Sequence, residues 1–93
     1  MVSDWREHVK RISAIIAPIL DRHGIAGELR VAFRNYALQL FRVIRKSKEE
    51  DREDLIKAVK AWYSTRLIID PEEIRKTLDE IAEAIKEYVK QHS

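Results

Sequence analysis

The stretch 29-LRVAFRNYALQLFRVIRKSK-48 decides the fold, because its apolar residues recur every three or four positions and it carries basic residues but no acidic one. On a helical wheel such a repeat puts one apolar face toward a core. That face consists of Leu29, Phe33, Tyr36, Ala37, Leu40, Val43 and Ile44. The other side consists of Arg30, Arg34 and Arg45 beside Val31, Leu38 and Phe41. Arginine and apolar residues, where a solvated helix would be simply polar, predict a second contact surface.

Three further amphipathic segments flank this helix, and no stretch shows the strict alternation of a half-buried strand. We expect helices over about 4–23, 28–46, 48–68 and 71–91, joined by short connections. Helices joined by short loops pack antiparallel to their neighbours. The sequence therefore predicts an all-α fold, a mostly antiparallel four-helix bundle formed as a single domain by residues 1–93.

The helix boundaries are predicted from capping residues and from one gap in the apolar pattern. Gly24 suits the left-handed position after the first helix. Ser47 begins a capping-box pattern for the third helix, and Asp70 is the expected cap of the fourth. No apolar residue occurs from Arg45 to Asp54. We therefore expect a break between the second and third helices rather than one continuous helix.

The four apolar stripes have the width of core-facing helices and are expected to meet in one core. Its predicted members are Trp5, Val9, Ile12, Ile16, Phe33, Leu40, Ile44, Leu55, Val59, Trp62, Leu78, Ile81 and Ile85. The outer face of the fourth helix is charged, so that helix needs no contact beyond the core and water.

Composition places the chain among small, charged helical proteins. It has 93 residues, 37% of them charged, and a formal net charge of only +2, so its overall field does not by itself attract nucleic acid or membranes. Basic residues outnumber acidic ones in the first half, and the reverse holds in the second. Without cysteine, a membrane-spanning run or a targeting segment, we expect a cytoplasmic protein. Abundant Arg, Lys, Glu and Ile are typical of thermophile proteins and also of computational designs.

Residues that carry catalysis or bind cofactors are not grouped in this sequence. The histidines, His8, His23 and His92, are scattered, and there is no histidine pair or Glu-x-x-His motif at metal-binding spacing. The two glycines do not form a phosphate-binding loop. We therefore expect no cofactor, no metal and no enzymatic activity.

One acidic run resembles a catalytic motif. The run 49-EEDRE-53 has the Glu-Glu-x-x-Glu form found in magnesium-dependent nucleotide pyrophosphohydrolases of the MazG type, which are all-helical. The resemblance is limited to this run. The downstream Glu-x-x-Asp of that family is absent, and the nearest match is Glu80 with Glu83. We interpret the run as a solvated first helical turn, where acidic residues suit the helix dipole.

A candidate cation–π or anion-binding site near the end of the third helix combines Trp62, Tyr63 and Arg66. Arg66 follows Trp62 by one turn on the apolar side of the helix, so its guanidinium can stack on an aromatic ring or bind an anion. The alternative is an arginine whose stem packs against the helix while its head reaches water.

The second helix carries the functional hypotheses. One is a structural exterior without biochemical function, in which arginines pair with acids of the third and fourth helices. The second is self-association as a two-fold dimer, or binding of another protein, and the third is binding of nucleic-acid phosphates. The candidate contact residues are Arg30, Val31, Arg34, Leu38, Phe41, Arg42 and Arg45.

We favour self-association, because apolar side chains interleave with the arginines and phosphate binding does not need them. On this hypothesis Leu38→Glu or Phe41→Glu yields a folded monomer, since a carboxylate without a partner is costly in an interface. On the nucleic-acid hypothesis Arg34→Ala and Arg45→Ala weaken binding to all sequences.

Overall fold

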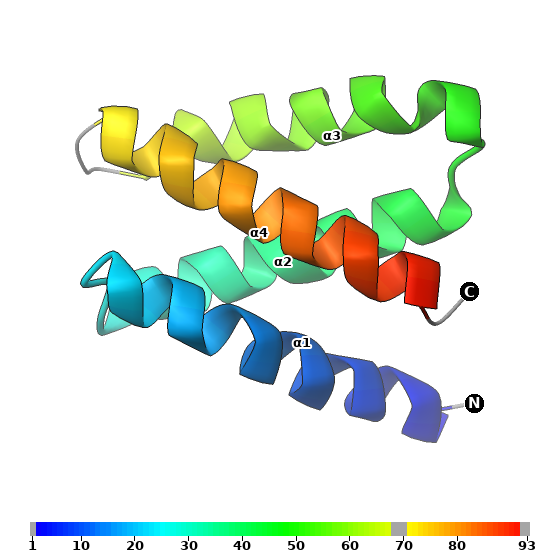
Figure 1. Cartoon of the computed structure of the whole chain (residues 1–93), viewed down its shortest axis with the longest axis horizontal. Helices are drawn as coiled ribbons and strands as arrows, with labels where there is room; N and C mark the ends of the chain where they lie inside the picture. Colours follow the sequence, from blue (N-terminus) through cyan, green and yellow to red (C-terminus); the bar gives the residue numbers. More distant parts are fainter. Residues whose placement is uncertain (1, 68–70, 92–93) are drawn as a thin grey trace.

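The computed structural model describes residues 2–67 and 71–91, with side chains for 5–67 and 72–91. These residues form four helices and no strand, and the chain direction alternates from each helix to the next (Figure 1). The helices are α1 (Val2–Arg22), α2 (Glu28–Lys46), α3 (Glu49–Ser64) and α4 (Pro71–Gln91). The predicted all-α, mostly antiparallel four-helix bundle is confirmed.

The helices α2 and α4 form the centre of the bundle, and each packs against all three others. The helices α1 and α3 lie on opposite flanks of this pair (Figure 1). Among the described residues α1 and α3 make no contact with each other. A flank helix therefore has only two neighbours, whereas α2 has three and buries a wider arc of its surface.

One apolar core joins the four helices, and they contribute to it unequally. All side chains of α3 are described, and Ile56 is its one buried residue. Burying a side chain of this size contributes about 1.5 to 3 kcal/mol, so α3 gains less from burial in the core than the other helices do. The buried apolar residues are Ile12, Ile16, Ile19, Leu20, Ile25, Phe33, Tyr36, Ala37, Leu40, Phe41, Ile44, Ile56, Leu67, Ile74, Leu78, Ile81, Ala82, Ile85, Tyr88 and Val89.

Two glycines determine the turn between α1 and α2. Gly24 and Gly27 have φ angles of 66° and 65°, in the left-handed region that favours glycine. The amide of Ile25 donates to the Leu20 carbonyl (2.9 Å) and the amide of Gly24 donates to the Asp21 carbonyl (3.1 Å), which is the Schellman arrangement. The predicted role of Gly24 is confirmed, and both ends of α1 lie within two residues of their predicted positions.

The expected break between α2 and α3 is present at Ser47 and Lys48, whose backbone is extended. The predicted capping role of Ser47 is wrong, because its hydroxyl donates to the Ile44 carbonyl (3.0 Å) and so closes the end of α2. Lys48 precedes α3 and makes no side-chain capping bond. The acidic first turn of α3 interacts favourably with the helix dipole instead.

The end of α3 was predicted too late, because the helix stops at Ser64 rather than at about 68. The hydroxyl of Ser64 donates to the Ala61 carbonyl (3.0 Å), and that of Thr65 donates to the Trp62 carbonyl (2.8 Å). These local bonds satisfy carbonyls at the helix end and compete with continued helix.

The boundaries of α4 agree with the prediction, since the helix covers Pro71–Gln91. The predicted cap Asp70 lies outside the described residues. The predicted stripe is buried along the whole helix and comprises Ile74, Leu78, Ile81, Ala82, Ile85, Tyr88 and Val89.

Candidate functional site

The face of α2 that was predicted to form a contact surface is partly covered by α1 and α4. Phe41 is only 2% exposed. The centroid of its ring lies 4.6 Å from that of His8, 5.7 Å from that of Tyr88 and 6.2 Å from that of Trp5. The predicted place of Phe41 in an interface is therefore wrong. The wheel assumed a single core-facing stripe, whereas α2 buries side chains against three neighbours.

The rest of this face forms an outward ridge on α2. Val31 is 48% exposed, and Leu38 is half-buried against the edge of the core. Arg34 is exposed and, among the described residues, makes no ion pair and no ring contact. We call Val31, Arg34 and Leu38 the α2 ridge.

Arg30 ties α2 to the end of α1. Its guanidinium donates to the Asp21 carboxylate (2.8 Å) and to the Ile25 carbonyl (3.1 Å). The acid that pairs with Arg30 thus belongs to α1. The structural hypothesis expected an acid of the third or fourth helix instead.

Two more arginines of α2 lie over aromatic rings. The guanidinium carbon of Arg42 is 4.6 Å from the centroid of the Trp5 ring, and that of Arg45 is 5.4 Å from the centroid of Phe41. Stacking of this kind contributes about 0.5 to 1 kcal/mol at an exposed site. It also holds both guanidinium groups against α1 or the core.

The helix α3 leaves part of its apolar stripe outside the core. Leu55 is 38% exposed and Trp62 is 52% exposed, although both were predicted to be core residues, and that prediction is wrong. Val59 between them is half-buried. The core position belongs to Ile56, on a neighbouring side of the helix. Because α3 is a flank helix, only a narrow sector of its surface, centred on Ile56, faces the core. Leu55 and Trp62 point roughly a quarter turn away from Ile56 around the helix axis.

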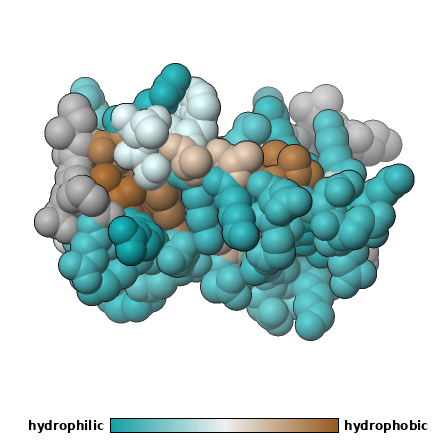
Figure 2. Space-filling model, turned by 90° about the horizontal axis from the view of Figure 1, so that it is seen from above, coloured by the Kyte–Doolittle hydropathy of each residue, from teal (hydrophilic) through white to brown (hydrophobic). Residues whose placement is uncertain are grey.

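A groove between α2 and α3, which we call the α2–α3 groove, runs beside this stripe. It consists of two hollows of about 380 Å³ each, and Gln39 lines both. Seen from above, Figure 2 shows a band of pale and brown residues across an otherwise hydrophilic face. Clustered apolar surface on a small domain marks a contact site. The other lining residues are Ala58, Val59, Trp62 and Tyr63 in one hollow, and Arg42, Val43, Lys46, Ser47 and Leu55 in the other.

The residues of the predicted aromatic and cationic site come together at one end of this groove. The guanidinium carbon of Arg66 lies 3.8 Å from the centroid of the Trp62 ring, and Tyr63 meets that ring edge-on at 4.8 Å. Tyr63 also packs against Tyr36 at 5.3 Å, and burial raises the pKa of Tyr63. The stacked guanidinium and the tyrosine together restrict the rotation of an exposed indole.

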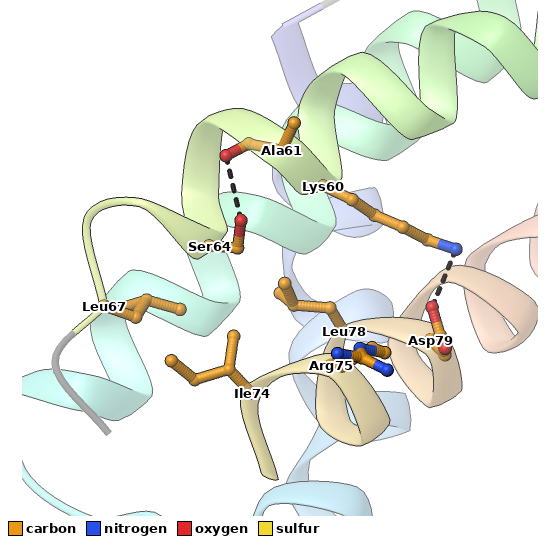
Figure 3. Close-up of a pocket in the computed structure, with 8 residues that line it drawn as sticks. All are labelled: Lys60, Ala61, Ser64, Leu67, Ile74, Arg75, Leu78 and Asp79. Carbon is orange, nitrogen blue, oxygen red and sulfur yellow. Dashed lines mark hydrogen bonds and ion pairs between the residues drawn. The ribbon is translucent and has the colours of Figure 1, made fainter. Parts of the chain in front are cut away.

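Another hollow, of about 410 Å³, lies between the end of α3 and the start of α4 (Figure 3). Ile74 and Leu78 form part of its apolar lining. Lys60 and Asp79 form an ion pair of 2.8 Å at its edge. The hydroxyl of Ser64 donates to a backbone carbonyl of its own helix. This hollow therefore does not present a hydroxyl nucleophile with a base beside it.

The acidic run 49–53 borders a charged cleft between the start of α3 and the end of α4. The ammonium group of Lys86 lies 2.7 Å from the Glu53 carboxylate and 3.0 Å from the Glu83 carboxylate. These hydrogen bonds lower the pKa of Glu53 and raise that of Lys86. Among the described residues no group of three or more His, Cys, Asp or Glu is arranged to hold a metal ion. The cleft thus does not reproduce the magnesium site of the MazG-type motif.

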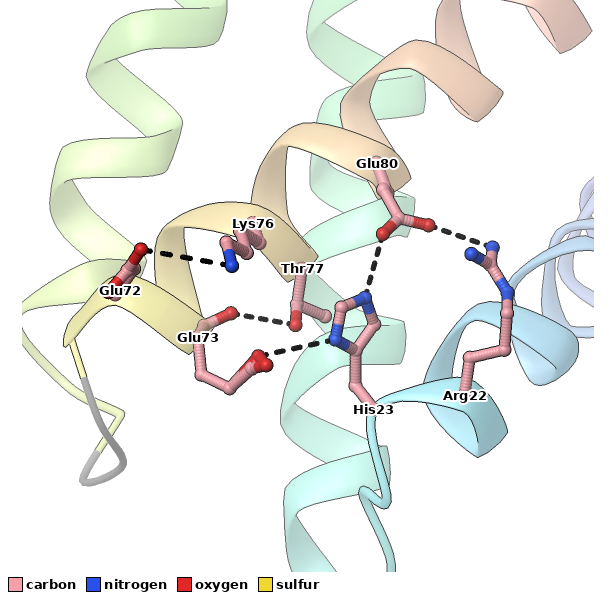
Figure 4. Close-up of polar contacts among 7 residues, drawn as sticks. All are labelled: Arg22, His23, Glu72, Glu73, Lys76, Thr77 and Glu80. Atoms are coloured by element: carbon pink, nitrogen blue, oxygen red, sulfur yellow. Dashed lines mark hydrogen bonds and ion pairs between the residues drawn. The ribbon is translucent and has the colours of Figure 1, made fainter.

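A polar cluster fastens the end of α1 to α4 (Figure 4). The Nε2 atom of His23 is 2.8 Å from Glu80 Oε1, and its Nδ1 atom is 3.4 Å from Glu73 Oε2. Arg22 pairs with the second oxygen of Glu80 at 2.8 Å. The hydrogen bond from His23 lowers the pKa of Glu80, and the charge of Arg22 acts in the same direction. The two carboxylates meet different edges of one ring, so they hold the imidazole instead of converging on an ion.

Comparisons with known proteins do not assign a function. None of the described helices combines the length and the apolar character needed to cross a membrane. The chain matches no protein family, no curated protein and no solved structure. The candidate site is therefore identified by geometry: it comprises the α2–α3 groove and the exposed stripe of α3. Val31 and Arg34 of the α2 ridge line a separate hollow between α1 and α2.

Proposed function

We propose that this chain is a non-enzymatic interaction module that binds another protein through the outer surface of α2 and α3. The observation that carries the proposal is the exposure of Leu55 and Trp62 beside an apolar groove. Large apolar side chains clustered on a surface lose solvent contact when a partner covers them, at about 25 cal/mol per Å² of apolar area. Tryptophan and arginine are also the residues most enriched at the energetic centres of protein interfaces.

The apolar surface supports a protein partner over nucleic acid. Arg30 is paired with a carboxylate, and Arg42 and Arg45 lie over aromatic rings of the same chain. Of the predicted phosphate-binding arginines, Arg34 alone lacks such a contact among the described residues. Binding to a phosphate backbone depends on several available cations. A groove of aromatic and aliphatic residues with cations at its rim is typical of protein interfaces.

The placement of titratable groups supports binding rather than catalysis. Catalytic sites gather residues with shifted pKa values in one pocket. Here burial raises the pKa of Tyr36 and of Tyr63, while ion pairs and hydrogen bonds between helices shift those of Glu53, Glu80 and Lys86. These groups are divided among the core, the α2–α3 groove, the charged cleft and the α1–α4 cluster, and the groove holds Tyr63 alone of them.

The simplest test of this proposal is self-association, because it requires no protein other than this chain. In sedimentation velocity at increasing concentration we expect the wild type to form a larger species. Leu55→Glu and Trp62→Glu should remain monomeric, because a carboxylate without a partner is costly in an interface. Both side chains are exposed in the monomer, so circular dichroism should show an unchanged helical fold.

Ala61→Glu is the matched control, since it adds the same carboxylate to an exposed position of α3 that lies off the stripe. It should associate like the wild type. A wild type that stays monomeric at every concentration, and forms a larger species only with an added RNA or DNA oligonucleotide, would contradict the proposal in favour of nucleic-acid binding.

A further inference from the structure

We infer that the protein bound at this surface is a second copy of the chain, with its α3 packed antiparallel against the α3 of the first. This inference rests on the proposed function and names the partner for the same site. It also moves the centre of the contact from α2, where the sequence placed it, to α3.

The exposed stripe of α3 matches its own reversed copy. Asp51 precedes Leu55 by four residues, and Arg66 follows Trp62 by four residues. Thr65, which links the helix to Arg66, keeps helical backbone angles, so Arg66 continues the same face. The stripe therefore reads acidic, apolar, apolar and basic from one end to the other. The positions that fall within an arc of about 100° are Asp51, Leu55, Ala58, Val59, Trp62 and Arg66.

A two-fold axis midway between Ala58 and Val59 pairs each residue of the stripe with a different residue of the partner's stripe. It places Leu55 against the partner's Trp62, and each contact occurs twice because the interface is isologous. The small side chain of Ala58 at the axis permits close approach of the two helices. An exposed leucine thus covers an exposed indole at two symmetric points.

The charges at the ends of the stripe select this orientation. In the antiparallel pair Asp51 meets the partner's Arg66, whereas in a parallel pair each meets its own counterpart and is repelled. Asp51 and Arg66 are both exposed, and neither makes an ion pair within the described part of the chain. Asp51 thus makes no ion pair with the described residues, and Arg66, whose guanidinium stacks on Trp62 of its own chain, meets the partner's Asp51 with the edge of that group. The antiparallel pair also aligns the two helix dipoles favourably.

Charge reversal tests the pairing directly. Asp51→Lys and Arg66→Glu each place like charges at both ends of the contact. Each variant alone should associate at least about tenfold more weakly than the wild type. In an equal mixture of the two variants, the introduced lysine faces the introduced glutamate at one end, and the native Asp51–Arg66 pair forms at the other. We expect the mixture to form a heterodimer, identified by sedimentation velocity and by its mass in native mass spectrometry.

Glu50→Lys provides the matched control. It makes the same charge change one residue away, on the side of α3 that points away from the stripe. It should associate like the wild type, alone and in mixtures.

Rescue in the mixture would support the inference, and it cannot come from variants that fail to fold. Two charge-reversed variants that each associate as tightly as the wild type would overturn it, and so would a mixture that stays monomeric. In either case the proposed function stands if Leu55→Glu abolishes wild-type association. A wild type that is monomeric throughout would overturn the inference and the self-association on which it rests.

Discussion

The hydroxyl of Tyr36 donates a hydrogen bond to the backbone carbonyl of Leu78 at 3.0 Å, inside the core where α2 crosses α4. Burial raises the pKa of Tyr36 far above its usual value, and the negative charge of Asp79 acts in the same direction. The two central helices are therefore joined by a neutral phenol that resists ionisation.

Tyr36→Phe should lower the free energy of unfolding by about 0.5 to 1.5 kcal/mol, because it removes this hydrogen bond and keeps the ring. Urea denaturation followed by circular dichroism measures the change. Tyr63→Phe is the control, since the Tyr63 hydroxyl makes no hydrogen bond among the described residues. Equal losses in both variants would mean that the bond to Leu78 does not stabilise the core.

The same tyrosine predicts a loss of stability in alkali. A phenol with a raised pKa in the folded chain contributes stability that is fully present below about pH 10, where the unfolded chain ionises, and is lost as the pH rises further. Titration of the wild type and of Tyr36→Phe should therefore show a steeper decline for the wild type. Parallel curves for the two chains would contradict the assignment of this pH dependence to Tyr36.

Phe41 gives a prediction opposite to the one made from the sequence. Because its ring is buried among α1, α2 and α4, Phe41→Glu should unfold the chain rather than yield a folded monomer. Phe41→Ala should cost about 3 to 5 kcal/mol. Leu38→Glu, at a half-buried position, should retain the helical signal in circular dichroism. A folded Phe41→Glu chain would show that the ring is not essential to the core.

The attachment of α3 is tested by two adjacent substitutions. Ile56→Ala should cost about 2 to 5 kcal/mol, since it empties the one buried position of the helix. Leu55→Ala should cost less than about 1 kcal/mol in the monomer, because much of that side chain is already exposed. Thermal and urea unfolding below the concentration of self-association compare the two. A larger loss at Leu55 would mean that α3 is rotated relative to the structure described.

The cluster around His23 predicts a loss of stability in acid. The pKa of Glu80 is lowered in the folded chain, chiefly by its hydrogen bond to His23. The resulting stability is present above the pKa of the unfolded carboxyl group, about 4.5, and is lost as the pH falls through the lower folded value. Glu80→Gln should therefore be less stable than the wild type at neutral pH, with the difference vanishing in acid. A difference independent of pH would contradict this assignment.

The parts of the fold that were predictable from the sequence depend on local signals. The pattern of α4 from Ile74 to Val89 keeps one apolar face, and Pro71 marks its start, so both its boundaries and its buried residues follow from periodicity. The positive φ of Gly24 is likewise predictable, because a glycine directly after the end of a helix commonly adopts the left-handed conformation. These signals do not depend on which helix lies beside which.

The errors at Phe41, Leu55 and Trp62 have one cause, which is the number of neighbours of each helix. A wheel shows which side of a helix is apolar but not how wide an arc the other helices cover. The central position of α2 buries Phe41, and the flank position of α3 exposes Leu55 and Trp62. The apolar stripe on α3 is wider than the arc that a helix with two neighbours buries, and this extra width is the sequence signal for a second surface. A wheel alone assigns the whole stripe to the core.

The two-residue link of Ser47 and Lys48 and the single buried Ile56 leave α3 the least restrained part of the described bundle. Local opening of such an element requires less free energy than global unfolding, so its backbone amides exchange with solvent first. A partner helix that covers the stripe would block this opening. Association would therefore reduce the local opening of α3, and the protection of its amides against hydrogen exchange would rise with protein concentration.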